Sequence, residues 1–277
     1  MNTQTRLHPD IICNPAPETA TAEERIVLET AMEAGHILLE NGAEIFRVEE
    51  TMDRICRRYG VHSGSFFVLS NGIFTTGGER DSMPFAKVRH IPVKGAQLDK
   101  VVAVNQLSRE IAEGHLSIEE VRAELERIRK LPGKSRWVQV LASGVGSAAF
   151  CILFGGTLYD SLASFIAGFL LYIFVLWVSA PHLSRIFGNI LGGALVTVLC
   201  ILCRTFGLGD DLSHIIIGAI IPLVPGVPFT NGIRDMAYGD YISGSVRLLD
   251  AILVFLCIAI GVGVTFSLYH RMGGPLQ

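Results

Sequence analysis

The sequence predicts a multi-span α-helical membrane domain of about five transmembrane helices, one of them broken by prolines, preceded by a small cytoplasmic α+β domain. Half of the 277 residues are hydrophobic, and the mean hydropathy is +0.45. Of the 49 Lys, Arg, Asp and Glu side chains only 11 follow Arg136, and none of these 11 is Lys or Glu. The second half therefore consists of apolar runs long enough to cross a hydrocarbon layer about 30 Å thick.

The domain boundaries follow from the same distribution of charge. Residues 1–22 are polar, contain three prolines and lack an apolar stretch of signal-peptide type, so we expect a disordered tail. Residues 23–133 should form the α+β domain, and residues 134–277 the membrane domain. The net charge of −3 gives no indication of a nucleic-acid surface.

Two helices open the predicted α+β domain. Apolar spacing predicts a helix over residues 22–39, with Thr21 and Glu24 as a capping box. A second helix over about 44–59 has an apolar stripe, and its other face carries charges three and four residues apart. On spacing alone this ladder favours weak ion pairs on a solvated surface over a functional role. Its members are Glu44, Arg47, Glu50 and Arg54.

Three short segments rich in Val, Ile, Phe and Thr then predict strands, namely SFFVLSN, GIFTTGG and KVRHIPV. Helices follow over residues 98–113 and, from a capping box of Ser117 and Glu120, up to Pro132. The sequence contains no Walker loop, no dinucleotide fingerprint, no GxSxG and no HExxH, so we predict no catalytic residue, cofactor or metal site.

Five spans fit the second half of the chain. We expect them at residues 137–154, 158–178, 186–203, about 212–230 for the broken one, and 248–269. The basic run RIRKLPGKSR precedes the first span, which places the N-terminal side in the cytoplasm and the C-terminus outside. Because the span count is odd and no internal repeat is visible, a second chain must supply the other half of any inverted repeat.

Three further features belong to these spans. Small residues at helix-contact spacing predict close packing between helices. Arg247 and Asp250 are expected to anchor the start of the last span at the membrane boundary. Cys200 and Cys203 form a CxxC motif, but this motif lies in an apolar run and no second pair of cysteines accompanies it. The small residues are Ser143, Gly144, Ser147, Ala148, Gly188, Gly192, Gly261 and Gly263.

Prolines interrupt the fourth span. Each proline lacks an amide hydrogen, so three carbonyls would lose their donors in a regular helix. A break in the backbone persists within a membrane where it is buried in protein or faces a watery cavity, and this predicts a substrate site. The residues concerned are Pro222, Pro225 and Pro228, the carbonyls of Gly218, Ile221 and Val224, and Gly226 as a further source of flexibility.

Polar side chains follow the break at Thr230, Asn231, Arg234 and Asp235. Arg234 could bind a substrate carboxylate, and Asp235 could bind an amino group or take part in proton coupling. The alternative, equal in weight on physical grounds, is an Arg234–Asp235 ion pair beside a helix that begins at Asn231.

Two long stretches resemble the threonine/serine exporter family. They read LLENGAEIFRVEETMDRICRRYGV at residues 38–61 and IPLVPGVPFTNGIRDMAYGDYISGSVRLLDA at residues 221–251, and the likeness covers roughly residues 24–268. The matched positions are Asn41, Gly42, Ala43, Glu44, Arg47, Glu49 and Glu50 in the first stretch, and Pro225, Gly226, Pro228, Asn231, Arg234, Asp235, Gly239 and Asp240 in the second.

The resemblance implies an N-terminal-half subunit of the split type, similar to the larger subunit of a two-component bacterial succinate exporter of the inner membrane. Its substrate would be a succinate-type dicarboxylate or threonine and serine, exported by the proton-motive force without a cofactor. The implied partners are a small, separately encoded membrane subunit, the substrate and the lipid bilayer, and assembly into a homo-oligomer stays open. The resemblance also raises the weight of a functional role, in gating or docking, for the stretch from Glu44 to Glu50.

Three functions are compatible with these features. The first is an exporter subunit whose broken span forms the substrate path. The second is a membrane-anchored hydrolase, because a carboxylate-rich helix beside strands could support acid and base chemistry. The third is a scaffold that transports nothing, in which the three prolines would tolerate replacement.

Overall fold

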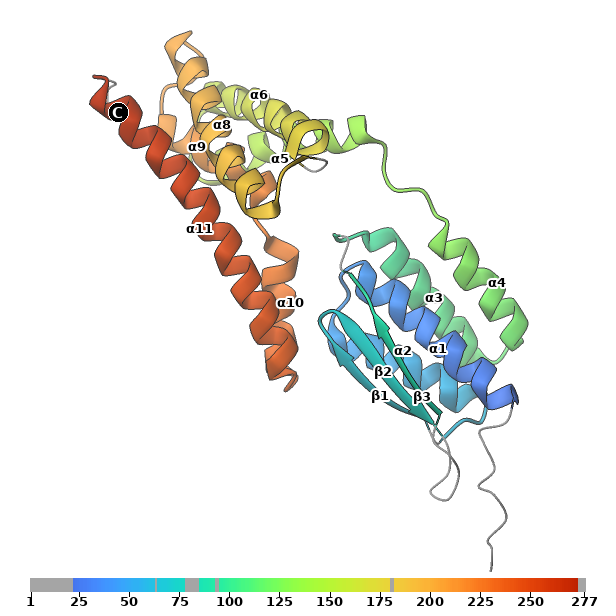
Figure 1. Cartoon of the computed structure of the whole chain (residues 1–277). Helices are drawn as coiled ribbons and strands as arrows, with labels where there is room; N and C mark the ends of the chain where they lie inside the picture. Colours follow the sequence, from blue (N-terminus) through green and yellow to red (C-terminus); the bar gives the residue numbers. More distant parts are fainter. Residues whose placement is uncertain (1–21, 63, 78–84, 93–94, 180–181, 274–277) are drawn as a thin grey trace, which may run out of the picture. The chain divides into compact units, whose positions relative to one another are not determined.

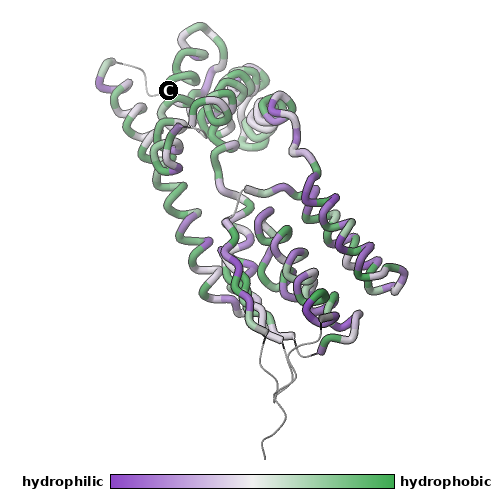
Figure 2. The backbone as a smooth tube through the Cα atoms, turned by 45° about the vertical axis from the view of Figure 1, so that its right-hand side comes forward, coloured by the Kyte–Doolittle hydropathy of each residue, from purple (hydrophilic) through white to green (hydrophobic). Residues whose placement is uncertain are grey.

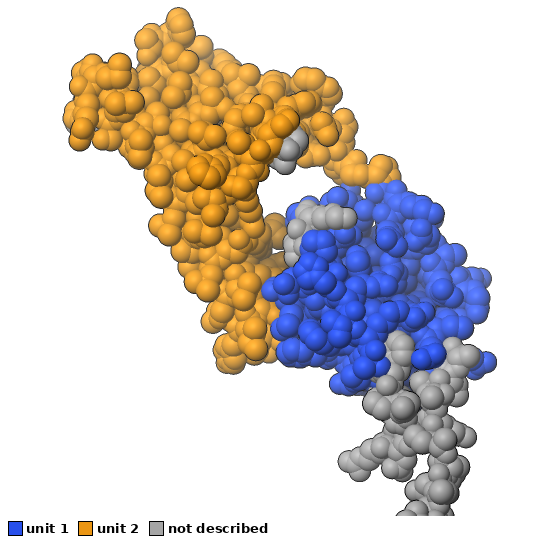
Figure 3. Space-filling view, in the orientation of Figure 1, with its two compact units in different colours: residues 1–131 blue, residues 132–277 orange. Residues whose placement is uncertain are grey.

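The computed structural model of the chain describes residues 22–62, 64–77, 85–92, 95–179 and 182–273. The chain divides into two compact units, residues 1–131 and 132–277, which are blue and orange in Figure 3. The helices of the second unit are hydrophobic along most of their length, whereas those of the first alternate between polar and apolar residues (Figure 2). The predicted N-terminal tail, apart from Ala22, lies outside the described residues, as does Thr21 of the predicted capping box.

Helices and a small sheet make up the first unit. Its described elements are α1 (Ala22–Glu40), α2 (Ile45–Arg58), β1 (Ser65–Leu69), β2 (Gly72–Gly77), β3 (Phe85–His90), α3 (Leu98–Glu113) and α4 (Ile118–Arg129). The antiparallel sheet has the order β1–β2–β3, and α1 and α2 pack on one of its faces (Figure 1). The helices and strands predicted here are confirmed, and so is the capping box of Ser117 and Glu120 at the start of α4.

The strand register separates a buried face of the sheet from an open one. Val68 lies opposite Ile73, and both side chains are buried in the core that α1 and α2 cover. On the other face Phe67 lies opposite Phe74, which lies opposite Val88, and all three are exposed. The sheet is therefore amphipathic across its two faces, as the period of two along each strand requires.

The second unit is helical throughout its described residues. Its elements are α5 (Arg136–Leu153), α6 (Leu158–Phe174), the π-helical turn η1 (Val175–Ser179), α8 (Arg185–Thr205), α9 (Leu212–Ile220), the 3₁₀ turn η2 (Ile221–Leu223), α10 (Gly226–Ala237) and α11 (Tyr241–Arg271). In length and composition α5, α6 with η1, α8 and α11 could each cross a membrane. The bent pair of α9 with η2 and α10 makes a fifth candidate, so the described residues carry four to five such segments.

Small and hydroxylated residues allow α5 and α6 to approach closely. Three serine hydroxyls donate hydrogen bonds to carbonyl oxygens of the facing helix, at 3.0–3.1 Å. Such bonds suit helices that lack a hydrophobic driving force between them in lipid. The bonds run from Ser143 to Gly168, from Ser161 to Ala148 and from Ser164 to Ser147.

Glycines play the same role between α8 and α11. A Cβ atom placed on Gly261 would lie 2.1 Å from the carbonyl oxygen of Ile190, and one on Gly193 would lie 2.7 Å from that of Ile258. Close packing was predicted for Gly261 and is confirmed. It was wrong for Gly263, where a Cβ would meet no described atom within 4 Å.

The last helix begins earlier than the sequence predicted. The expected loop around residues 231–247 is instead the end of α10, a short turn and the first residues of α11. Gly232 and Gly244 explain the difference, because a Cβ on Gly244 would lie 2.8 Å from the Gly232 carbonyl oxygen. The two helices pack backbone against backbone as a hairpin, which α10 and the N-terminal half of α11 form in Figure 1.

Candidate functional site

The break in the fourth span lies between α9 and α10, which are bent by 67° relative to each other. The chain does not continue as a regular helix here, in which three carbonyls would have lost their donors; it tightens into shorter turns instead. The amide of Ile221 donates to Gly218, that of Val224 to Ile221 at 3.0 Å, and that of Gly226 to Val224 at 2.9 Å. Two bonds of the 3₁₀ type, to Gly218 and Ile221, and one bond between residues two apart, to Val224, thus replace those that proline removes from an α-helix.

The prolines have different roles in this geometry. Pro222 lies in η2, and Pro225 occupies the N-cap position of α10, so both belong to the bend. Pro228 is the third residue of α10, where an amide hydrogen has no partner within the helix, and it interrupts nothing. Gly226 is exposed, and a Cβ there would meet no described atom within 4 Å.

A cavity of about 370 Å³ lies beside the bend, between α5, α6 and η2. Gln139, Ser143 and Tyr172 bring polar groups to its wall, where Ile221 and Pro222 contribute the bend itself. The Tyr172 hydroxyl lies 3.4 Å from Oε1 of Gln139. Sequence reasoning missed Gln139 and Tyr172, although an amide and a phenol inside apolar spans were a visible signal.

The polar residues after the break lie on α10. Asp235 is fully buried, and its carboxylate accepts a hydrogen bond of 2.8 Å from Nη1 of Arg247 on α11. The side chain of Arg247 is only 10% exposed, so this is a buried ion pair that joins the two helices of the hairpin. Asn231 lies inside α10, so a helix that begins at Asn231, one of the two alternatives from the sequence, is not observed. The boundary anchor expected of Arg247 and Asp250 stays a prediction.

The remaining residues around the hairpin are more exposed. Arg234 lies on the exposed side of α10, and the hydroxyl of Thr230 donates to the carbonyl of Gly226 within the same helix. Asp240 is the N-cap residue of α11, and its amide donates to the carbonyl of Asp235 at 2.9 Å. Its carboxylate makes no capping hydrogen bond to α11.

A second buried carboxylate, which the sequence analysis missed, lies at the other end of the bundle. Asp160 in the first turn of α6 is 1% exposed. It accepts hydrogen bonds from the amide and hydroxyl of Thr157 and from the amides of Asp210 and Asp211, at 2.7–3.0 Å. This carboxylate therefore joins the α5–α6 loop to the α8–α9 loop. In the sequence, the signal for this site was the single aspartate, Asp160, in a run of small residues.

In the first unit the predicted motif shapes the turn between α1 and α2. The side-chain amide of Asn41 donates to the carbonyl of Ile37 at 2.7 Å, and Gly42 has a φ of +84°, a conformation that favours glycine. Glu44 is the N-cap residue of α2, and Arg47 donates to its carboxylate at 2.8 Å.

The other two motif residues also have partners. Glu49 accepts a hydrogen bond of 3.1 Å from the amide of Val68 and thereby joins α2 to β1, and Glu50 forms an ion pair with Arg54 at 2.6 Å. The ion pairs expected along this face are therefore present.

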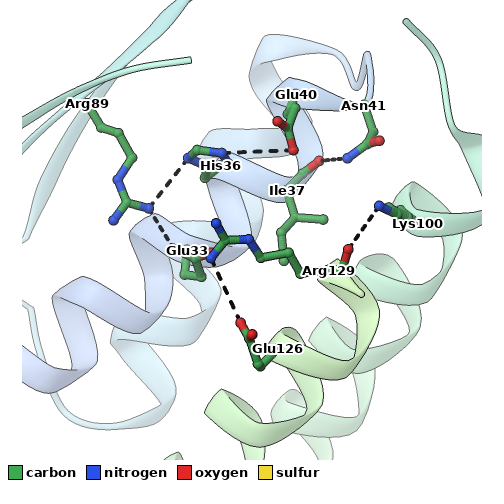
Figure 4. Close-up of polar contacts among 9 residues, drawn as sticks. All are labelled: Glu33, His36, Ile37, Glu40, Asn41, Arg89, Lys100, Glu126 and Arg129. Atoms are coloured by element: carbon green, nitrogen blue, oxygen red, sulfur yellow. Dashed lines mark hydrogen bonds and ion pairs between the residues drawn. The ribbon is translucent and has the colours of Figure 1, made fainter. Parts of the chain in front are cut away.

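A network of charged side chains surrounds His36 of α1 (Figure 4). Nη1 of Arg89 lies 3.5 Å from Nδ1 of His36, and Glu40 lies 3.9 Å from its Nε2. Burial lowers the pKa of the His36 imidazole, and the charges of Arg89 and Arg129 act in the same direction, against those of Glu33 and Glu40. His36 is therefore a neutral hydrogen-bonding group at neutral pH.

Among the residues that the structure describes, no group of three or more His, Cys, Asp or Glu is arranged to hold a metal ion. Cys200 is buried in α8, and Cys203 is partly buried one turn later.

Membrane-capable helices, a bend beside a cavity with a few polar groups and a buried ion pair are features of a multi-pass membrane protein. Residues 29–269 match the profile of the threonine/serine exporter family, and the chain belongs to this family.

Two of the named relatives have nearly the same length as this chain, and a third is about twice as long. The protein named probable succinate transporter subunit YjjP of Klebsiella aerogenes is 26% identical over 253 residues, which cover 91% of this chain and 97% of that protein. Its Escherichia coli K12 namesake is 25% identical over 258 residues, 91% and 98% of the two chains. The probable threonine/serine exporter of Mycobacterium tuberculosis is 20% identical over 261 residues, 91% of this chain and 48% of that protein. No solved structure matches the chain.

Proposed function

We propose that the chain is a subunit of a secondary exporter of the inner membrane, which carries a small organic acid or amino acid and works with a separate small membrane subunit. The names of the relatives supply the solute class, a succinate-type dicarboxylate or threonine and serine. The observation that carries the proposal is the cavity beside the bend between α9 and α10, to which Gln139, Ser143 and Tyr172 bring polar groups. Discontinuous helices next to solvated space are a common architecture of substrate sites in transporters.

Aromatic and basic side chains at one end of the bundle indicate a membrane boundary. The ring centroids of Trp137, near the start of α5, and Trp177, in the middle of η1, lie 5.5 Å apart, and the Arg136 guanidinium lies 5.7 Å from the centroid of the Trp177 ring. Arg185 at the start of α8 pairs with Asp250 of α11 at 2.7 Å. Tryptophans and basic residues concentrate at membrane interfaces. We therefore place the cytoplasmic boundary at this end of the bundle.

The cavity then begins about half a helical turn inside that boundary, because Gln139 follows Trp137 by two residues. Its polar groups are held loosely enough to exchange partners. The bond of 3.4 Å from Tyr172 to Gln139 is long for a hydroxyl donor, and a solute carboxylate could take its place.

The buried pair of Asp235 and Arg247 gives the proton-coupling role a mechanism. A proton on Asp235 would neutralise the carboxylate that Arg247 binds at 2.8 Å. Arg247 would then lose the negative charge that it binds at 2.8 Å, which favours a rearrangement of the α10–α11 hairpin. Export driven by the proton-motive force would use this change to open or close the path beside the bend.

The exposed face of α10 supports the proposal of a second subunit. This helix packs chiefly against α11, and within the hairpin it leaves Val227, Ile233 and Arg234 exposed. A mixed apolar and charged face next to a membrane boundary suits contact with another membrane chain better than contact with lipid alone.

Efflux from cells preloaded with labelled succinate or threonine tests the proposal. We would compare the chain alone, the chain with its small membrane subunit, and the pair carrying Tyr172→Phe. The loss of one hydroxyl should slow efflux by about fivefold, which corresponds to roughly 1 kcal/mol. Tyr159→Phe is the matched control, since Tyr159 is on the same helix but exposed and outside the cavity. Equal efflux with Tyr172→Phe, or efflux from the chain alone, would contradict the proposed path or the partnership, respectively.

A further inference from the structure

The first unit contains a charged cleft of about 480 Å³. Three elements form its walls, and each contributes side chains at the spacing that its geometry places on one face. Glu29 and Glu33 are four residues apart on α1, and Lys87 and Arg89 alternate along β3. The third wall is the face of α4 that carries Arg122, Glu126 and Arg129.

Ion pairs account for most of these charges. Lys87 donates to Glu29 at 2.7 Å, and Arg89 donates to Glu33 at 2.6 Å. Arg129 reaches the second oxygen of Glu33 at 3.3 Å. Figure 4 shows the carboxylate of Glu33 between these two arginines.

Arg122 is the exception. It makes no hydrogen bond or ion pair with the residues that the structure describes, although its charge contributes to the lowered pKa of Glu29, behind the hydrogen bond from Lys87. The cleft contains four basic and three acidic side chains, so one positive charge is not matched. If the ion pairs served only to join β3 and α4 to α1, the fourth basic side chain, Arg122, would not be needed.

We propose that the cleft binds a small carboxylate, with Arg122 as its anchor. Glu33 lies between two guanidinium groups, which shows how a carboxylate is bound here. The guanidinium of Arg122 has donors that are free among the described residues, and it could form the same kind of hydrogen bonds with the carboxylate of a ligand. The volume suits a molecule of a few carbon atoms with water. Glu126, which is half exposed, could accept a bond from an ammonium group, so an amino acid fits as well as a dicarboxylate.

The choice of ligand rests on the proposed function, because the carboxylates tested are those that the chain is proposed to export. A cleft in the first unit that binds the solute would let its concentration regulate the transporter. This role is separate from the cavity beside the bend, whose residues belong to the second unit.

Binding of labelled succinate and threonine to the full chain in lipid nanodiscs tests the inference. Arg122→Gln should weaken the binding of one of them by at least tenfold, since it removes a charge-assisted hydrogen bond. Arg109→Gln is the matched control, because Arg109 is exposed on α3, pairs only with Gln106 among the described residues, and does not line the cleft. It should leave the affinity unchanged.

Two further arms separate this inference from the proposed path. Tyr172→Phe should slow efflux and leave binding at the cleft intact. If binding is instead lost with Tyr172→Phe and retained with Arg122→Gln, the solute binds in the membrane cavity and the inference is overturned. Inorganic phosphate is the second probe. If it displaces the carboxylate at equal concentration, the cleft is a general anion surface and the inference fails. It also fails if neither carboxylate binds saturably.

Discussion

Removing one charge of the buried ion pair between α10 and α11 should destabilise the protein more than any exposed charge change. The substitution is Asp235→Ala. Asp235 is 0% exposed and Arg247 is 10% exposed, and 2.8 Å separates their charged atoms. The variant leaves the Arg247 guanidinium buried without its carboxylate, and this is the main source of the cost.

Breaking a buried pair by deleting one partner costs about 3–5 kcal/mol. For a unit of about 150 residues, 1 kcal/mol shifts the unfolding midpoint by about 2–4 °C, so the expected loss is roughly 10 °C. Asp250→Ala is the control, because it breaks the pair of Arg185 and Asp250, whose side chains are 59% and 43% exposed. An exposed pair contributes about 0–1 kcal/mol, so its midpoint should move by no more than about 3 °C.

The assay is thermal unfolding in detergent, followed by loss of the monodisperse peak after heating. Arg247→Ala and the double variant Asp235→Ala/Arg247→Ala complete a double-mutant cycle. If the two residues interact, the double variant should lose less than the sum of the single losses, with a coupling of about 1–3 kcal/mol. Additive losses, or a loss for Asp235→Ala no greater than that for Asp250→Ala, would refute the reasoning.

Three other changes test separate parts of the structure. Gly261→Ala should destabilise the chain by about 1–3 kcal/mol, because its Cβ would lie 2.1 Å from the Ile190 carbonyl oxygen, whereas Gly263→Ala, with open space around it, should be neutral in the same assay. Asp160→Asn should lower the unfolding midpoint and increase proteolysis of the two loops it joins, since an amide nitrogen would then face backbone donors; unchanged protection would contradict this. The unsubstituted protein should lose stability as the pH falls below about 6.5, because His36 has a lower pKa in the folded chain and therefore binds a proton more readily in the unfolded chain. His36→Gln should reduce this loss between pH 7.5 and 5. Equal pH profiles for the two proteins would contradict that assignment.

Local patterns predicted most of the fold. Strands of period two, apolar helical stripes and the Ser117 capping box depend on residues close in sequence, and all of them appear at the expected positions. The packing of α5 on α6 could also be predicted, because small residues at spacings of three and four indicate close approach without knowledge of the partner helix.

The candidate site was less predictable, because its contacts join distant residues. Arg185 and Asp250 are 65 residues apart, and the partners Asp235 and Arg247 are 12 apart across a turn that the sequence placed in a longer loop. Proline chemistry correctly located the bend but could not show that shorter turns would satisfy the carbonyls. In a 3₁₀ turn a carbonyl accepts a hydrogen bond from the amide three residues later, whereas in an α-helix it accepts one from the amide four residues later. The sequence alone does not show that the Ile221 carbonyl accepts the first of these bonds.

The length of α11 separates two roles within the proposed path. From Asp250 to Arg271 the helix rises about 31 Å, which matches the hydrocarbon thickness, so the residues from Tyr241 to Asp250 would extend about 14 Å beyond the boundary proposed at Arg185 and Asp250. With the membrane placed in this way, the ion pair of Asp235 and Arg247 would lie close to water rather than at the membrane centre. Such a position suits a group that exchanges protons with the cytoplasm. The cavity of Gln139 and Tyr172 lies inside the boundary, which makes it the better candidate for solute binding, and the bend between α9 and α10 connects the two.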